Sequence, residues 1–222
     1  MNKYIKIPMI TISLLLILLF CTFTVSAAGK TVRVTVNMNG GYMYDKKSYT
    51  AEASFDHMPQ SGETHDYHLY TNGYNYPYRK GYAFDGFYFE KSYKTRVKDM
   101  SDAFARAYNN PNGRVTVYAK WTKKNCKKVT LIFGKKFNPP YIEKHTGYDK
   151  KKKQWTLYLK KGQRIAEVFY PSFSYSDNKY QITGFYSDKK CKKKVADDVF
   201  DLLGVTVNKN MKLYAKMKKV KG

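Results

Sequence analysis

The sequence predicts an α+β fold made of mixed sheets, each covered by one helix. Tyrosine and phenylalanine supply 22 and 13 of the 222 residues, and aromatic side chains pack well on the pleated surface of strands. Several short segments alternate apolar and polar residues, which is the period of a half-buried strand. A helical pattern follows each of two Gly-Phe-Tyr segments, and a further strand pattern follows each helix. This order of elements is typical of α+β domains.

The first 27 residues are predicted to be a secretory signal peptide. Lys3 and Lys6 give a positive start, residues 10–20 form an uncharged apolar run, and residues 25–28 are small enough for signal peptidase. The apolar run is shorter than the roughly 20 residues of a membrane-spanning helix. The alternatives are an uncleaved anchor and a lipoprotein lipidated at Cys21, although Phe20 is not the small residue that lipidation needs there. We expect a protein that is secreted or loosely associated with the cell surface, without membrane insertion after cleavage.

Three short matches recur in the same order along the chain, which predicts an internal duplication. The matched pairs, offset by 98, 96 and 96 residues, are 86–88 with 184–186, 102–104 with 198–200, and 118–120 with 214–216. We therefore expect two modules, residues 31–122 and 128–217, joined by the short basic segment 123–127.

Each module is expected to contain strands, then one helix, then a strand. In the first module these are a strand over 31–38, a turn at 39–41, a strand around Leu69, a strand at 86–88, a helix over 100–108 that stops at 110–113, and a strand over 115–119. In the second they are strands over 129–133 and 155–159, a strand at 184–186, a helix over 195–203 that ends at Gly204, and a strand over 213–217.

The first module also carries three longer blocks, VTVNMNGG at 34–41, PYRKGYAFDGFY at 77–88 and VYAKW at 117–121. Together they resemble the Listeria-Bacteroides repeat, also called the internalin B-repeat. The second module keeps only GFY at 184–186 and LYAK at 213–216. The resemblance implies two tandem ubiquitin-like β-grasp modules in an exported or surface protein of bacteria. Such modules serve as spacers or interaction units and have no catalytic role.

The two modules differ strongly in charge. The whole chain has 41 basic and 17 acidic residues. Residues 30–122 hold 13 basic and 9 acidic residues, a net charge of +4, whereas residues 123–222 hold 26 and 8, a net charge of +18. Crowded like charges destabilise a folded module, and a bound polyanion relieves the repulsion.

We therefore expect the second module to bind anionic extracellular polymers, either a polysaccharide of the glycosaminoglycan type or a cell-wall polymer of the teichoic-acid type, as in adhesion. Nucleic acid should bind only nonspecifically. The expected binding residues are Lys150, Lys151, Lys152, Lys153, Lys160, Lys161, Lys189, Lys190, Lys192, Lys193, Lys194, Lys218, Lys219 and Lys221. One alternative is a structural spacer or a module that binds a host or bacterial surface protein. Another is an enzyme or toxin whose site has no recognisable motif.

Motifs for catalysis or metal binding are absent from the sequence. His65 and His68 have no third ligand at a motif spacing, although zinc sites need three or four. Asp197, Asp198 and Asp201 fall near the start of a predicted helix, where acids complement the helix dipole. No nucleophile elbow or phosphate loop is present. We expect neither enzymatic activity nor a cofactor.

Two cysteines, Cys126 and Cys191, remain once the signal peptide is removed. Export permits a disulfide between them, and its loop of about 65 residues would stabilise the fold by about 4 kcal/mol. Two free thiols or an intermolecular bridge are the alternatives. Tyrosines between residues 67 and 78 either cover a small core or form a binding surface.

The signal peptide generates the first prediction. N-terminal sequencing of exported protein should begin close to Ala28 or Gly29, because the small residues before them suit signal peptidase. Recovery of a membrane-embedded chain that still begins at Met1 would contradict it.

Overall fold

The computed structural model describes residues 29–43, 45–60, 76–134, 137, 146–169 and 180–219. Predictions for the signal peptide, for a strand around Leu69, for His65 and His68, and for Lys221 lie outside the described residues.

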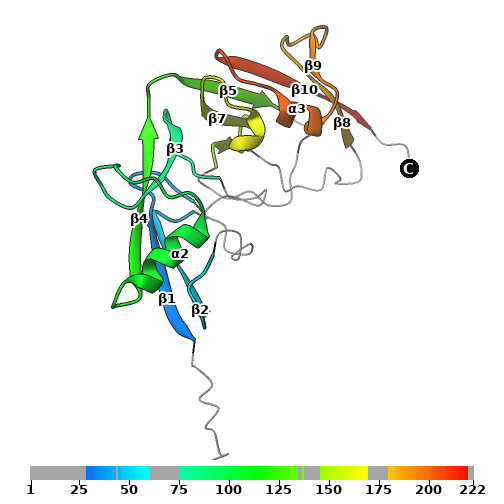
Figure 1. Ribbon diagram of the computed structural model, residues 1–222. Helices are drawn as coiled ribbons and strands as arrows, with labels where there is room; N and C mark the ends of the chain where they lie inside the picture. Colours follow the sequence, from blue (N-terminus) through cyan, green and yellow to red (C-terminus); the bar gives the residue numbers. More distant parts are fainter. Residues whose placement is uncertain are drawn as a thin grey trace, which may run out of the picture.

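Residues 30–122 contain a four-stranded mixed sheet with one helix on one face (Figure 1). The elements are β1 (Lys30–Asn37), β2 (Ser48–Phe55), β3 (Ala83–Tyr88), helix α2 (Met100–Asn109) and β4 (Arg114–Thr122). The strand order is β2-β1-β4-β3. Strand β1 is antiparallel to β2 and parallel to β4, and β3 is antiparallel to β4.

The second sheet has six strands in the order β6-β7-β5-β10-β8-β9. Its elements are β5 (Cys126–Ile132), β6 (Tyr148–Asp149), β7 (Gln154–Lys160), the 3-10 helix η1 (Ile165–Glu167), β8 (Tyr180–Tyr186), β9 (Lys194–Ala196), helix α3 (Val199–Gly204) and β10 (Met211–Lys219). Strand β5 is antiparallel to β7 and parallel to β10, which is antiparallel to β8. The predicted α+β class is confirmed as strand-rich mixed sheets with few helices.

The inner part of the second sheet, β7-β5-β10-β8, has the same order and strand directions as β2-β1-β4-β3. The pairing of residues also corresponds, since Tyr88 lies opposite Tyr118 and Tyr186 opposite Tyr214. In each sheet the strand pairing is irregular next to one glycine. This glycine is Gly86 in β3, with φ of 122°, and Gly184 in β8, with φ of 146°. The equivalent positions of the two sheets can therefore be compared one by one.

Alternating apolar residues build one buried face in each sheet, as their period predicts. Beneath α2 lie Val32, Val34 and Val36, none of which is exposed. The second core contains Val129 and Leu131 of β5 in the same way, together with residues of η1 and α3. Burial of these faces fixes the strand register, because a slip by one residue would turn every apolar side chain outward.

Two predicted equivalences are wrong. The first module's counterpart of β7 is β2, not a strand around Leu69, because β2 and β7 hold the same place beside β1 and β5. In the helices, Asp99 accepts a hydrogen bond from the Asp102 backbone N–H, and Asp198 accepts one from the Asp201 backbone N–H, each at 2.9 Å. Asp198 is thus equivalent to Asp99, so the match of 102–104 with 198–200 was three residues out of register.

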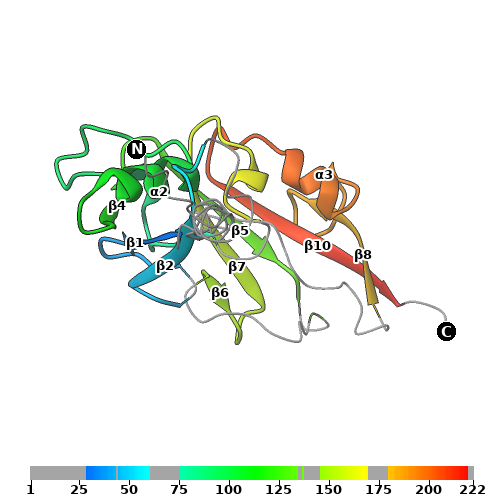
Figure 2. The same ribbon diagram turned by 60° about the horizontal axis from the view of Figure 1, so that its bottom comes forward.

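The two sheets meet where β3 lies next to β7. Figure 2 shows β7, β5, β10 and β8 following one another away from the first sheet. This arrangement covers part of the edge of β7 with residues of the first half of the chain. Covered edges protect a sheet from pairing with other chains.

The shared helix caps generate a stability prediction. Asp99→Ala and Asp198→Ala should each lower the free energy of unfolding by about 1 kcal/mol, because each substitution removes an N-cap acceptor. As a control, Asp197→Ala removes only an exposed ion pair with Lys194 and should cost less than about 0.5 kcal/mol. Urea denaturation of the three variants measures the differences. Equal losses in all three would contradict the assigned caps.

Candidate functional site

The second sheet has one face that η1 and α3 leave uncovered. Paired residues of neighbouring strands point to the same side of a sheet. Leu131 pairs with Leu213 on the buried side, so Thr130 and Lys212, one residue earlier in each strand, point to the opposite side. We call this side the open face; its residues on β5, β7, β8 and β10 include Lys128, Thr130, Thr156, Tyr158, Tyr186, Lys212, Tyr214, Lys216 and Lys218. Thr130 and Tyr186 are buried between their neighbours, and the exposed part of the face lies at its lysines.

Four exposed lysines stand on the open face. Lys212, Lys216 and Lys218 alternate along β10, and Lys128 lies on the neighbouring β5. Successive side chains on one face of a strand are about 6.8 Å apart. None of the ion pairs between described residues involves any of these four lysines. The open face thus carries a row of uncompensated positive charge.

The equivalent face of the first sheet carries a carboxylate among its basic residues, which include Arg33 and the neighbouring Arg114. There Arg33 of β1 forms an ion pair with Glu52 of β2, and the hydrogen bond from Arg33 lowers the pKa of Glu52. At the equivalent positions of the second sheet, Lys128 lies opposite Tyr158. The carboxylate partner is therefore replaced by a phenol.

At a second equivalent position, the second sheet has a lysine where the first sheet has a threonine. Thr116 lies beside Thr35 in the first sheet. Lys212 lies beside Thr130 in the second. The two sheets thus share a scaffold but differ in the electrostatics of one face.

Several acidic residues of the second half accept hydrogen bonds from backbone N–H groups in turns and at the start of α3. Asp149 accepts hydrogen bonds from the backbone N–H groups of Lys151 and Lys152 at 3.0 Å, and these bonds lower its pKa. Asp188 accepts from the backbone N–H groups of Lys193 and Lys192, with the same effect. Asp198 caps α3, in agreement with the prediction that this acid lies at a helix start. Asp149 pairs with Gln154, which pairs with Ile132, so it lies on the same side of the sheet as the open face, but on the outer strand β6. Strands β7 and β5 separate it from the lysines of β10.

The structure does not bring the predicted lysines into one patch. Residues 150–153 form the turn between β6 and β7, beside the carboxyl end of β5, and Lys150 to Lys152 are exposed. Residues 188–193 form the turn between β8 and β9, which extends toward the amino end of β10. Because β5 and β10 are parallel, these two turns lie at opposite ends of the sheet. Lys218 and Lys219 end β10 and are exposed, as is Lys161.

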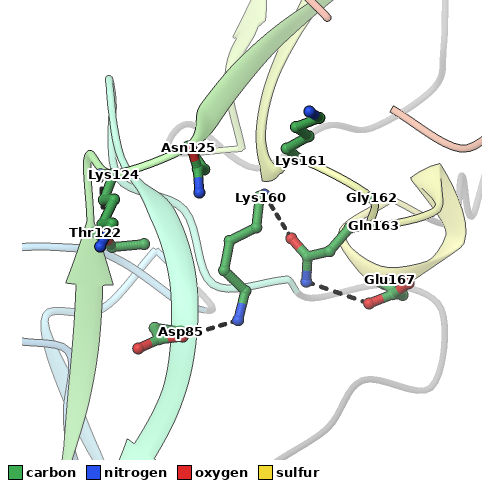
Figure 3. A pocket seen from close by; sticks show the side chains of 9 residues that line it. All are labelled: Asp85, Thr122, Lys124, Asn125, Lys160, Lys161, Gly162, Gln163 and Glu167. Carbon is green, nitrogen blue, oxygen red and sulfur yellow. Dashed lines mark hydrogen bonds and ion pairs between the residues drawn. The ribbon is translucent and has the colours of Figure 1, made fainter. Parts of the chain in front are cut away.

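Lys160, predicted to bind a polyanion, instead forms an ion pair within the protein. Its ammonium group lies 2.8 Å from a carboxylate oxygen of Asp85, and Lys120 approaches the other oxygen at 3.6 Å. Figure 3 shows the Lys160 side chain directed at Asp85, away from Lys161. Partial burial disfavours the Asp85 carboxylate, but the hydrogen bond from Lys160 and the charges of Lys160 and Lys120 outweigh it and hold the pKa of Asp85 below its usual value. Lys160 therefore joins the two sheets and is already paired.

A cleft of about 560 Å³ lies beside this ion pair (Figure 3). Its walls are Asp85, Thr122, Lys124, Asn125, Lys160, Lys161, Gly162, Gln163 and Glu167. Their polar groups bind one another: Gln163 accepts from the Lys160 backbone N–H at 2.7 Å and donates to Glu167 at 3.2 Å. Neither a cysteine nor a histidine is among the residues that line the cleft.

Two tyrosines of the predicted aromatic cluster lie where the two halves of the chain meet, which we call the junction, as does the Asp85–Lys160 ion pair. Tyr76 donates a hydrogen bond to the Ala166 carbonyl at 2.7 Å, and the Tyr78 ring lies 6.1 Å from that of Tyr158. Burial raises the pKa of Tyr78 to about 12, with a contribution from Tyr158. Both side chains thus contact the second half of the chain, Tyr76 at η1 and Tyr78 at β7. The tyrosines at 67, 70 and 74 lie outside the described residues.

The predicted disulfide is not formed, because Cys126 and Cys191 are free cysteines. Strand β10 separates β5, which begins with Cys126, from β8, which leads to Cys191. Two strand spacings amount to about 10 Å, whereas disulfide-bonded residues have Cα atoms less than about 7 Å apart. Burial raises the pKa of Cys126, so its thiol is protonated at neutral pH.

Lys128, Lys212 and Lys216 were not among the predicted binding residues. Lys212 and Lys216 each stand alone between other residues, so a search for runs of lysine passes over them, and Lys128 follows Lys127 at the end of the basic segment that joins the modules. The pattern Lys212-x-Tyr214-x-Lys216-x-Lys218, read with the period of a strand, would have found the row.

Comparisons with protein-family models, curated proteins and solved structures give no match. Among the described residues, no helix is long and apolar enough to cross a bilayer. The same residues contain no group of three or more His, Cys, Asp or Glu side chains that could hold a metal ion.

The junction generates a pH prediction. Because the pKa of Asp85 is lower in the folded than in the unfolded protein, its stabilising contribution is present above about pH 4 and is lost as the pH falls further. Asp85→Asn should therefore lower the free energy of unfolding at pH 7 by about 1 kcal/mol, and the difference from the wild type should shrink toward pH 3. Thermal unfolding from pH 3 to 7 measures it, with Asp197→Asn as an exposed control. A difference that does not depend on pH would contradict the assigned role of the carboxylate.

Proposed function

We propose that this chain is an exported protein that binds anionic extracellular polymers through the open face of its second sheet. The observation that carries the proposal is the row formed by Lys128, Lys212, Lys216 and Lys218, without ion-pair partners among the described residues. The equivalent position of the first sheet pairs Arg33 with Glu52. Such a charge row attracts polyanions and releases their counterions on binding.

The two halves are proposed to be tandem β-grasp modules of the Listeria-Bacteroides repeat type. Support comes from the shared strand order and from the corresponding pairs Tyr88–Tyr118 and Tyr186–Tyr214. The signal-like N-terminus fits a binding protein at the cell surface.

A spacer or protein-interaction module is the second candidate. The observation that favours it is the junction, in which Asp85–Lys160 and Tyr76–Ala166 hold the two sheets together. A fixed junction suits a rod-like spacer. It also suits a binding protein that presents one face in a constant orientation, so binding measurements must separate the two candidates.

Immobilised heparin with a salt gradient tests the proposal on the full mature chain. The open-face variant K128Q/K212Q/K216Q/K218Q should elute at lower salt than the wild type. In nucleic-acid systems, each lost phosphate contact lowers the slope of log K against log salt by roughly 0.7 to 0.9, so four lost contacts should lower it by about three.

The matched control is K150Q/K151Q/K152Q/K189Q, which removes the same charge from the two turns. It should elute closer to the wild type. Equal shifts of both variants would show that only net charge matters and would overturn the open-face assignment. A wild type that heparin does not retain at physiological salt would favour the spacer.

A further inference from the structure

One tyrosine interrupts the lysine row. Tyr214 stands between Lys212 and Lys216 on β10 and points to the same open face. The two lysines are about 6.8 Å from it on either side, measured along the strand. The side chain of Tyr214 is partly exposed. A ligand that lies along β10 therefore passes the ammonium group of Lys212, the ring of Tyr214 and the ammonium group of Lys216 in this order.

The other three tyrosines at corresponding positions carry a lysine over the ring. Lys91 lies 5.8 Å from the ring centre of Tyr118, and Lys120 lies 4.8 Å from that of Tyr88. Tyr186 has two such neighbours, Lys216 at 5.9 Å and Lys194 at 6.0 Å.

Tyr214 differs from these three tyrosines. Among the described residues, no cation and no second ring contacts it. Its equivalent in the first sheet, Tyr118, has the Lys91 contact. Tyr214 thus combines partial exposure with the absence of a cation over its ring among the described residues, at the centre of the charged row.

We infer that the polymer bound by the open face is an anionic polysaccharide, and that one of its sugar rings stacks on Tyr214 while its anionic groups contact Lys212 and Lys216. This inference rests on the proposed function and narrows its ligand class. An aromatic ring offers a large apolar face at little cost in conformational entropy. The C–H face of a sugar packs on such a ring, whereas a chain of phosphates has no ring to place there.

Binding of the full mature chain to two polymers separates these contributions. Heparin supplies sugar rings and anionic groups, and inorganic polyphosphate supplies anionic groups alone. Tyr214→Ala should weaken heparin binding about 5- to 10-fold, the lower part of the range for ring stacking in nucleic-acid binding, and change polyphosphate binding less than 2-fold. Tyr214→Phe should bind both polymers like the wild type, because it keeps the ring.

Polyphosphate binding also serves as the folding control for Tyr214→Ala, and Tyr118→Ala is the matched control on the first sheet, expected to leave heparin binding unchanged. Equal losses for heparin and polyphosphate, or no loss for heparin, would overturn the stacking inference while the lysine-dependent binding stands. A wild type that binds neither polymer would overturn both the inference and the proposed function.

Discussion

The parallel pairing of β5 with β10 is the constraint on which the open face depends. In chain order β5 is the first strand of the second sheet and β10 is the last, and their pairing places both at the centre of the sheet, with Leu131 beside Leu213. Burial of these two residues fixes the register, since a slip by one residue would expose them. The same register places Lys128 and Lys212 on the opposite side, although they lie far apart in the sequence. A buried apolar contact thus determines where the charges gather.

The two sheets show how one scaffold supports two surfaces. Strand order and the central tyrosine pairs correspond, and both helices begin with a capping aspartate. Two differences raise the charge of the second face: Tyr158 stands in place of Glu52, which removes a carboxylate, and Lys212 stands in place of Thr116. Fold and function are therefore separable here: the core residues specify the sheet, and the alternate residues of the same strands specify what it can bind.

Local patterns predicted much of the fold. Alternation identified β1 and β5, and the Gly-Phe-Tyr segments identified β3 and β8. Strand β2 was missed because Ser48–Phe55 combines small and polar residues with few large apolar ones. The disulfide and the lysine patch depended on which strands are neighbours, which is set by pairing between distant segments and not by local sequence. Lys160 illustrates the difference, since its partner Asp85 belongs to the other sheet.

Binding at the open face is tested most directly by mapping amide chemical-shift changes in the ¹⁵N-labelled mature chain during titration with a short heparin fragment. Binding along the open face predicts that the largest changes fall on Lys128, Lys212, Tyr214 and Lys216, with small changes at the equivalent residues Arg33, Thr116, Tyr118 and Lys120. Changes confined to the lysine turns at 150–153 and 189–193, or spread evenly over both sheets, would contradict it.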